Sequence, residues 1–172
     1  MAENMADLET PFWAFSLAVY ASDGVAEECL GLQERLGLDV NLLLFAAYIG
    51  AVEGVRLERQ DFAGAQAVVA EWHKEIVRSL RHARQALKPP STDVDNPLRA
   101  ATATLRLQAK RAELESEKIE QAMLWRWSRQ QLASHPRSDG ALANNVRGVL
   151  AFCGDADAPC PRLLDAAARY TK

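Results

Sequence analysis

The stretch from Leu38 to Val52, LDVNLLLFAAYIGAV, is the most apolar run of the chain. A helix that is hydrophobic on nearly every side has to be surrounded by other elements, because none of its faces suits water. Asp39 opens the run and can cap its helix, and Asn41 and Glu53 bracket its apolar part, so these three residues are the polar groups expected beside it. The run is too short to cross a bilayer comfortably. It therefore predicts the central helix of a small bundle.

The other periodic segments also read as helices. Thr10 followed by Pro11 is typical of a helix start, and Gly37 is a natural helix stop. From Asp61 a long helix is predicted by apolar residues that recur every three or four positions until Pro89, namely Phe62, Ala65, Val69, Trp72, Ile76, Leu80, Ala83 and Leu87. No alternating pattern of useful length indicates a β-strand. The predicted fold class is all-α.

A single domain over residues 1–172 is expected, since a chain of this length can bury a real core. Its predicted parts are a cluster of short helices over 10–52, a long antiparallel helical hairpin over 61–133, and C-terminal helices over 141–170. The short N-terminal helices are expected to pack on the hairpin. The prediction is thus a helical bundle built around one apolar helix.

The second long helix of the hairpin is predicted from Pro97 to about Ala133, which corresponds to ~55 Å. A compact domain of this size is only about 40 Å across. The helix must therefore kink, break or protrude. Apolar residues recur every seven positions along it, as in a thin coiled-coil seam, at Leu98, Leu105, Ala112 and Ile119. An exposed apolar seam on a protruding helix favours the binding of a partner.

The segments FWAFSLAVY and LGLQERLGLDVNLLLF carry a resemblance to a known group of proteins. They resemble an uncharacterised family of small helical proteobacterial proteins that is described only as a domain of unknown function. The resemblance covers residues from Phe12 to about Gln121. It implies a recurrent bacterial cytosolic domain, and it implies no activity, cofactor or site residue.

Charge is distributed unevenly, although the whole chain carries only −3. Residues 1–77 hold four Lys/Arg and thirteen Asp/Glu, whereas residues 78–111 hold eight Lys/Arg and two Asp/Glu. The basic stretch is a candidate patch for an anion or a partner, formed by Arg78, Arg81, Arg84, Arg106, Lys110 and Arg111. A solvated face, or pairing with the acidic N-terminal helices, is the competing interpretation. Nucleic acid is disfavoured, because no aromatic residues are interleaved with these charges.

No residue pattern predicts catalysis, a metal or a cofactor. His73 and His82 are nine positions apart and so point to opposite sides of a helix, and no Glu-x-x-His pair is present. Cys153 and Cys160 have no standard zinc spacing, and whether they have a redox role stays open. Three cysteines without a framework spacing are typical of reduced thiols in the cytoplasm.

Two functional hypotheses follow. The first is a non-enzymatic cytoplasmic interaction or regulatory module, bound to a protein partner or homodimeric through the second long helix. Trp125 or Trp127, two positions apart near the end of that helix, is its candidate docking anchor. The alternative is a small-molecule- or anion-binding protein, or an unusual enzyme. Its pocket would lie between the N-terminal helices and the hairpin, with Asp39, Asn41 and Glu53 as polar groups. Neither hypothesis involves a membrane.

Overall fold

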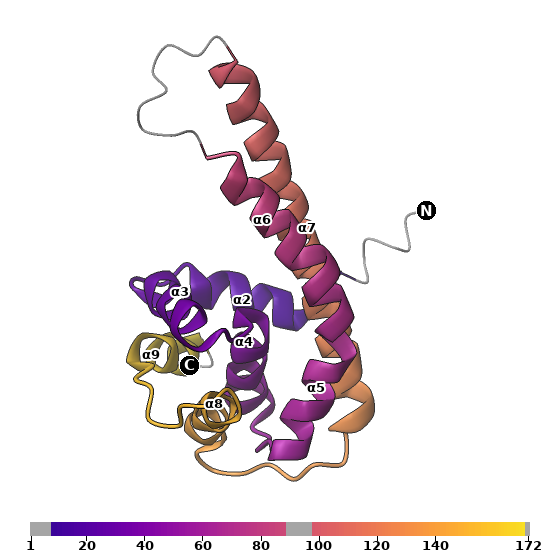
Figure 1. Cartoon of the computed structure of the whole chain (residues 1–172). Coiled ribbons are helices and arrows are strands. Elements are labelled where there is room, and N and C mark those ends of the chain that lie inside the picture. Colours follow the sequence, from indigo (N-terminus) through magenta and orange to yellow (C-terminus); the bar gives the residue numbers. More distant parts are fainter. Residues whose placement is uncertain (1–7, 89–97, 171–172) are drawn as a thin grey trace.

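The computed structural model describes residues 8–88 and 98–170 and shows an all-α protein (Figure 1). Within these ranges no strand forms, and Val55 and Arg137 make an isolated bridge. Two π-helical turns, η1 (Ile49–Glu53) and η2 (His73–Val77), continue the helices that precede them. The helices are α2 (Pro11–Tyr20), α3 (Val25–Leu36), α4 (Val40–Tyr48), α5 (Arg59–Trp72), α6 (Arg78–Ala86), α7 (Arg99–Gln131), α8 (Ala141–Phe152) and α9 (Pro161–Tyr170).

Local chemistry sets the helix ends where the sequence predicts them. The Thr10 hydroxyl accepts a hydrogen bond from the Trp13 amide at 3.0 Å and so caps α2. Asp39 caps α4 in the same way, through the Asn41 amide at 2.9 Å. Gly37 ends α3 with a φ of 65°, a left-handed conformation that suits glycine. These contacts confirm the predicted caps and stop.

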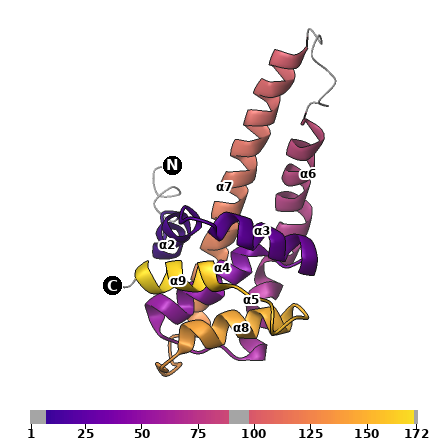
Figure 2. The ribbon, with the colours of Figure 1, turned by 90° about the vertical axis from the view of Figure 1, so that its left-hand side faces the viewer.

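The apolar run at 38–52 is the central helix of the bundle, as predicted. Every residue of α4 from Asn41 to Tyr48 is buried. Helices α2, α7, α8 and α9 surround it, and Figure 2 shows α4 enclosed between the N-terminal and C-terminal helices. Phe12 packs edge-on against Phe45, with ring centroids 5.7 Å apart. The hydrophobic core thus forms around α4 because that helix has no face for water.

A buried asparagine fixes the extended chain between η1 and α5. Asn145 of α8 is fully buried, and its side-chain amide donates to the Ala46 and Val55 carbonyls at 3.3 and 2.9 Å. Its Oδ1 accepts from the Leu57 amide at 2.8 Å. The Val55 carbonyl and the Leu57 amide, which belong to no helix, are paired in this way, so the buried residues of this segment keep their backbone hydrogen bonds.

Helices α5, η2 and α6 run as one rod antiparallel to α7 and form the predicted long hairpin (Figure 1). Its outer part projects from the rest of the molecule: α6 packs against α7 and η2, and Arg81 near its start also reaches Gln33 of α3. No residue of 78–88 or 98–112 is buried. Of the three possibilities left open by its length, the second long helix therefore protrudes. The predicted turn at Pro89 lies outside the described residues.

The π-helical turn η2 changes which residues of the first long helix face inward. The three-four pattern predicts Ile76 on the inner face, but Ile76 is 38% exposed and Val77 is completely buried. A π-helical turn accommodates an extra residue, so side chains beyond its start are rotated relative to an uninterrupted α-helix. The prediction for Ile76 was wrong for this reason.

The predicted coiled-coil seam of α7 does not face α6. Between 98 and 112 the less exposed positions of α7 are Thr102, Arg106 and Ala109, which share a face with Glu113. Because Glu113 pairs with Arg81 and Arg84, this is the face that α6 covers. The line formed by Leu98, Leu105 and Ala112 lies beside it and is exposed to solvent.

Two glycines provide a test of the packing around the central helix. A Cβ atom on Gly50 would lie 2.5 Å from the Cα atom of Leu142, too close for any rearrangement short of moving α8. We therefore expect Gly50→Ala to lower the free energy of unfolding by at least about 2 kcal/mol. Urea denaturation followed by circular dichroism measures this change.

Gly31→Ala is the matched control, because Gly31 lies inside α3 and, apart from the adjacent backbone of that helix, no atom lies within 4 Å of the added methyl group. Alanine there is expected to raise the free energy of unfolding by roughly 0.5–1 kcal/mol through its helix propensity. Equal effects of the two substitutions would contradict the close approach of η1 and α8.

Candidate functional site

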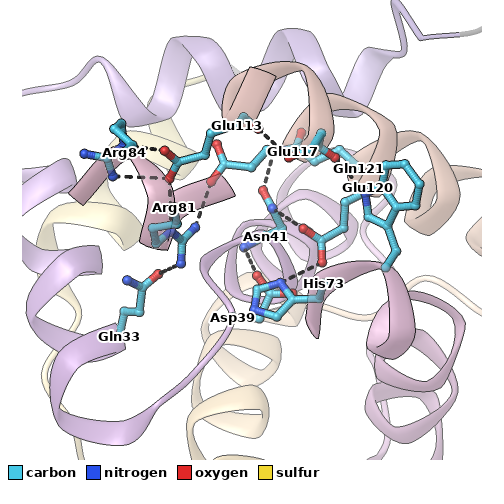
Figure 3. Close-up of polar contacts among 12 residues, drawn as sticks. Gln33, Asp39, Asn41, His73, Arg81, Arg84, Glu113, Glu117, Glu120 and Gln121 are labelled. Carbon is cyan, nitrogen blue, oxygen red and sulfur yellow. Dashed lines mark hydrogen bonds and ion pairs between the residues drawn. The ribbon is translucent and has the colours of Figure 1, made fainter. Parts of the chain in front are cut away.

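A group of buried polar side chains lies where the hairpin crosses the central helix (Figure 3). We refer to Asp39, Asn41, His73, Glu120 and Gln121 as the polar junction. Asp39 precedes α4, His73 is the first residue of η2, and Glu120 and Gln121 lie in the inner half of α7. Three elements distant in sequence thus contribute to one site.

His73 faces two carboxylates at the centre of the polar junction. Its Nδ1 lies 2.9 Å from Oε1 of Glu120 and 3.4 Å from Oδ2 of Asp39. The other Asp39 oxygen, Oδ1, caps α4, so each oxygen of this carboxylate has its own role. Glu120 is completely buried, whereas the Asp39 and His73 side chains are 14% and 19% exposed. The centre is thus close to the surface without being open to it.

Asn41 holds the second oxygen of Glu120. Its Nδ2 donates to Oε2 of Glu120 at 2.7 Å, and its Oδ1 accepts from Nε2 of Gln121 at 2.8 Å. Trp72, next to His73, donates from Nε1 to the Ser116 carbonyl of α7 at 3.0 Å and so fixes η2 against that helix. The orientation of the Glu120 carboxylate is therefore set by a neutral neighbour.

A second set of contacts joins the two helices of the hairpin just outside the polar junction (Figure 3). Arg81 donates from Nε to Glu113 at 3.1 Å, from Nη1 to Gln33 at 2.9 Å and from Nη2 to Glu117 at 2.8 Å. Arg84 also donates to Glu113. Two members of the predicted basic patch are thus engaged within the molecule. Arg78, Lys110 and Arg111 are exposed and Arg106 is half-buried.

The electrostatics of the polar junction favour a bound positive charge. Burial, with repulsion from Glu120, raises the pKa of the Asp39 carboxyl to about 7. Burial also disfavours the His73 imidazolium, but the hydrogen bond to Glu120 and the charge of Asp39 outweigh it and raise the pKa of His73. The charge of Arg81 opposes the proton on His73. Burial, with a smaller contribution from the charge of Asp39, raises the pKa of the Cys153 thiol. A proton or a cation between these two carboxylates therefore stabilises them.

The remaining predicted site residues lie elsewhere. Glu53 accepts a hydrogen bond from the Tyr48 hydroxyl at 3.1 Å and lies 3.6 Å from Arg129, away from Asp39 and Asn41. Trp125 and Trp127 are both partly buried and pack against the core, and Trp127 meets Phe45 edge-on at 6.1 Å. The structure thus joins two of the three predicted polar groups and leaves neither tryptophan as a projecting anchor.

Two hollows lie away from the polar junction. One of about 310 Å³ is lined by Arg59, Phe62 and Phe152 among others, and one of about 240 Å³ lies beside Glu53 and Arg137. Side chains of the polar junction contact each other directly instead of enclosing a space. Its chemistry therefore suits a proton or a small ion.

His73, Glu120 and Gln121 are the site residues that the sequence reasoning missed. The sequence pattern sets His73 beside Glu71 and Glu75 on the polar side of the first long helix, and Glu120 lies beside Ile119 of the predicted seam. Asn41 inside an apolar run was the usable sign, because a buried amide requires polar partners from other elements. It indicated that a site exists without showing which residues complete it.

The fold and the polar junction define an all-α protein in which a projecting helical hairpin is anchored on a buried polar cluster. None of the described helices combines the length and the apolarity that crossing a bilayer requires. The chain belongs to the family described as "Protein of unknown function (DUF2390)", whose model matches residues 11–124 and so includes the whole polar junction. No curated protein and no solved structure matches the chain.

The raised pKa values predict that stability falls as the pH increases. Around pH 6 the folded protein retains the Asp39 proton that the unfolded chain has released, so the free energy of unfolding decreases with pH. His73 acts in the same direction: its contribution is complete below pH ~6.5 and is lost as the pH rises through its raised pKa. In chelator-treated protein, we expect the contribution of Asp39 to the free energy of unfolding to decrease by about 1 kcal/mol per pH unit between pH 5 and 7.

Asp39→Asn isolates this effect, because asparagine also caps a helix but does not titrate. The free energy of unfolding is to be measured by urea denaturation at several pH values for both proteins. Parallel pH profiles for the wild type and Asp39→Asn would contradict the raised pKa of Asp39.

Proposed function

We propose that the protein is an interaction module that pairs with a second copy of itself through α7 of its projecting hairpin. The observation that supports this proposal is the exposed apolar line of α7. Leu105 is 51% exposed, and Ala112 seven positions later is also exposed, although α6 already covers the neighbouring face of the helix. Exposed apolar residues aligned on a projecting element are typical of a protein–protein contact.

The spacing of this line supports a helix as its occupant. A repeat of seven residues keeps apolar side chains on one side of a slightly supercoiled helix, which is the arrangement that a second helix covers. Small residues, Ala101 and Ala112, alternate with Leu105 and allow the two backbones to approach. The same apolar line on a second copy of the protein has this spacing and these small residues. A two-fold axis sets such equivalent surfaces against each other.

Charge supports an antiparallel pair. Between Arg99 and Arg111 the helix carries four basic residues and no acidic one. Parallel pairing would set these charges side by side, at a cost in repulsion. Antiparallel pairing directs the basic end of one α7 toward the inner half of the other, where Glu115 is exposed. We place this association in the bacterial cytoplasm, which the free thiols of Cys29, Cys153 and Cys160 support.

Leu105→Glu tests the interface. A charge in the middle of the apolar line has to be desolvated when the helices pair, so the variant is expected to be monomeric where the wild type is dimeric. Light scattering coupled to size-exclusion chromatography over a wide range of concentrations measures the mass. We expect the dissociation constant to increase at least ~100-fold, which corresponds to about 2.7 kcal/mol.

Leu107→Glu is the matched control, because Leu107 is 57% exposed but lies about 200° around the helix from Leu105. It is expected to leave the dimer intact. A wild type that stays monomeric at every concentration would overturn the proposal, as would a dimer lost with Leu107→Glu and kept with Leu105→Glu.

A further inference from the structure

The three charged groups of the polar junction have the arrangement of metal ligands. The ligand atoms of Asp39, His73 and Glu120 all lie within 4.8 Å of one another. We propose that the polar junction binds one divalent transition-metal cation through His73 Nδ1, Asp39 Oδ2 and Glu120 Oε1. This site is independent of the pairing proposed for α7, since it lies at the base of the hairpin.

The distances between the ligand atoms fit a single ion. Bonds of about 2.1 Å to nitrogen and oxygen in a tetrahedral arrangement set neighbouring ligand atoms ~3.4 Å apart. Nδ1 of His73 lies 3.4 Å from Oδ2 of Asp39 and 2.9 Å from Oε1 of Glu120. The Asp39 and Glu120 oxygens lie within 4.8 Å of each other, so small movements of these carboxylate side chains admit the ion. The helix caps and π-helical turn that orient the ligands stay as they are.

The charge of the ligands also favours the binding of a cation. When an ion displaces the protons of Asp39 and His73, the two carboxylates and the neutral imidazole carry a charge of −2, and Glu120 is completely buried. A buried negative charge is costly unless it is paired or coordinates a metal. Arg81, whose charge opposes the proton on His73, gives its three donor groups to Gln33, Glu113 and Glu117. A divalent ion neutralises the site without drawing on that arginine.

Asn41 and Gln121 supply the outer contacts that metal ligands usually have. Asn41 binds Oε2 of Glu120 and leaves Oε1 directed at His73. Gln121 donates to Asn41, while its Oε1 is buried and has no hydrogen-bond partner in the described part of the chain. Buried acceptors of this kind are rare in native structures, and this one lies next to Glu120 in the sequence of α7.

The donor set selects the class of metal. One imidazole nitrogen and two carboxylate oxygens suit Zn²⁺, Fe²⁺, Co²⁺ or Mn²⁺ better than a soft ion that prefers thiolates. Three protein ligands leave at least one position for water, as in catalytic zinc sites. Asp39 and His73 are each partly exposed, which gives the ion a path from solvent. The sequence predicts no metal because these ligands are 34 and 47 positions apart along the chain.

Isothermal titration calorimetry with Zn²⁺ and, separately, Mn²⁺ tests the site on the full chain, after treatment with a chelator that is then removed. We expect one ion per chain for the wild type, with a rise in melting temperature. Glu120→Gln and Asp39→Asn each remove a charged ligand while keeping the shape, so affinity is expected to fall on the order of 100-fold or more. Circular dichroism shows whether each variant is folded.

His135→Asn is the matched control, because His135 also faces a carboxylate, Asp61 at 3.6 Å, without a third ligand among the described residues. This variant is expected to bind the ion as the wild type does. The proposal is overturned if folded wild-type protein binds neither ion stoichiometrically. It is also overturned if Asp39→Asn retains full affinity or if His135→Asn loses it.

Discussion

The completely buried carboxylate of Glu120 is the constraint on which the arrangement of the hairpin depends. An ionised group away from water has to be paired, or its burial costs several kcal/mol. Its partners come from two other elements: Asn41 at the start of α4 and His73 at the start of η2. The crossing point of α7 over the central helix is therefore fixed by one side chain. An apolar residue at this position would leave Asn41 and His73 unsatisfied in turn.

The same constraint divides the hairpin into two parts. On the core side of the polar junction, α5 and the second half of α7 pack against the hydrophobic core. Glu113, held by Arg81 and Arg84, is the outermost buried residue of α7, and beyond it the two helices bury only each other's flanks. Polar contacts, which are directional, hold the base of the hairpin. The outer part keeps its apolar line exposed because nothing else in the described chain reaches it.

Local features of the fold were predictable from the sequence. The all-α class, the central helix and the caps at Thr10 and Asp39 depend on residues close together in sequence, and the structure confirms them. Asn41 was predicted to be a polar group at the core, and it is. The partners of Asn41 were not predictable, because Glu120 and Gln121 lie 79 and 80 positions further along the chain. Periodicity within one helix carries no information about contacts over such a distance.

The magnitudes explain why the π-helical turn persists. A regular helix would bury Ile76, whereas the turn buries Val77 instead, a side chain smaller by one methylene group, worth about 0.8 kcal/mol. In exchange the turn sets Arg81, one helical turn beyond Val77, at 3.1 Å from the buried carboxylate of Glu113. Leaving a buried charge without its partner costs roughly 3–5 kcal/mol, several times the loss at Ile76. The break in periodicity is therefore a consequence of the buried acid, and a π-helical turn opposite a buried carboxylate on a neighbouring helix indicates a site that periodicity alone conceals.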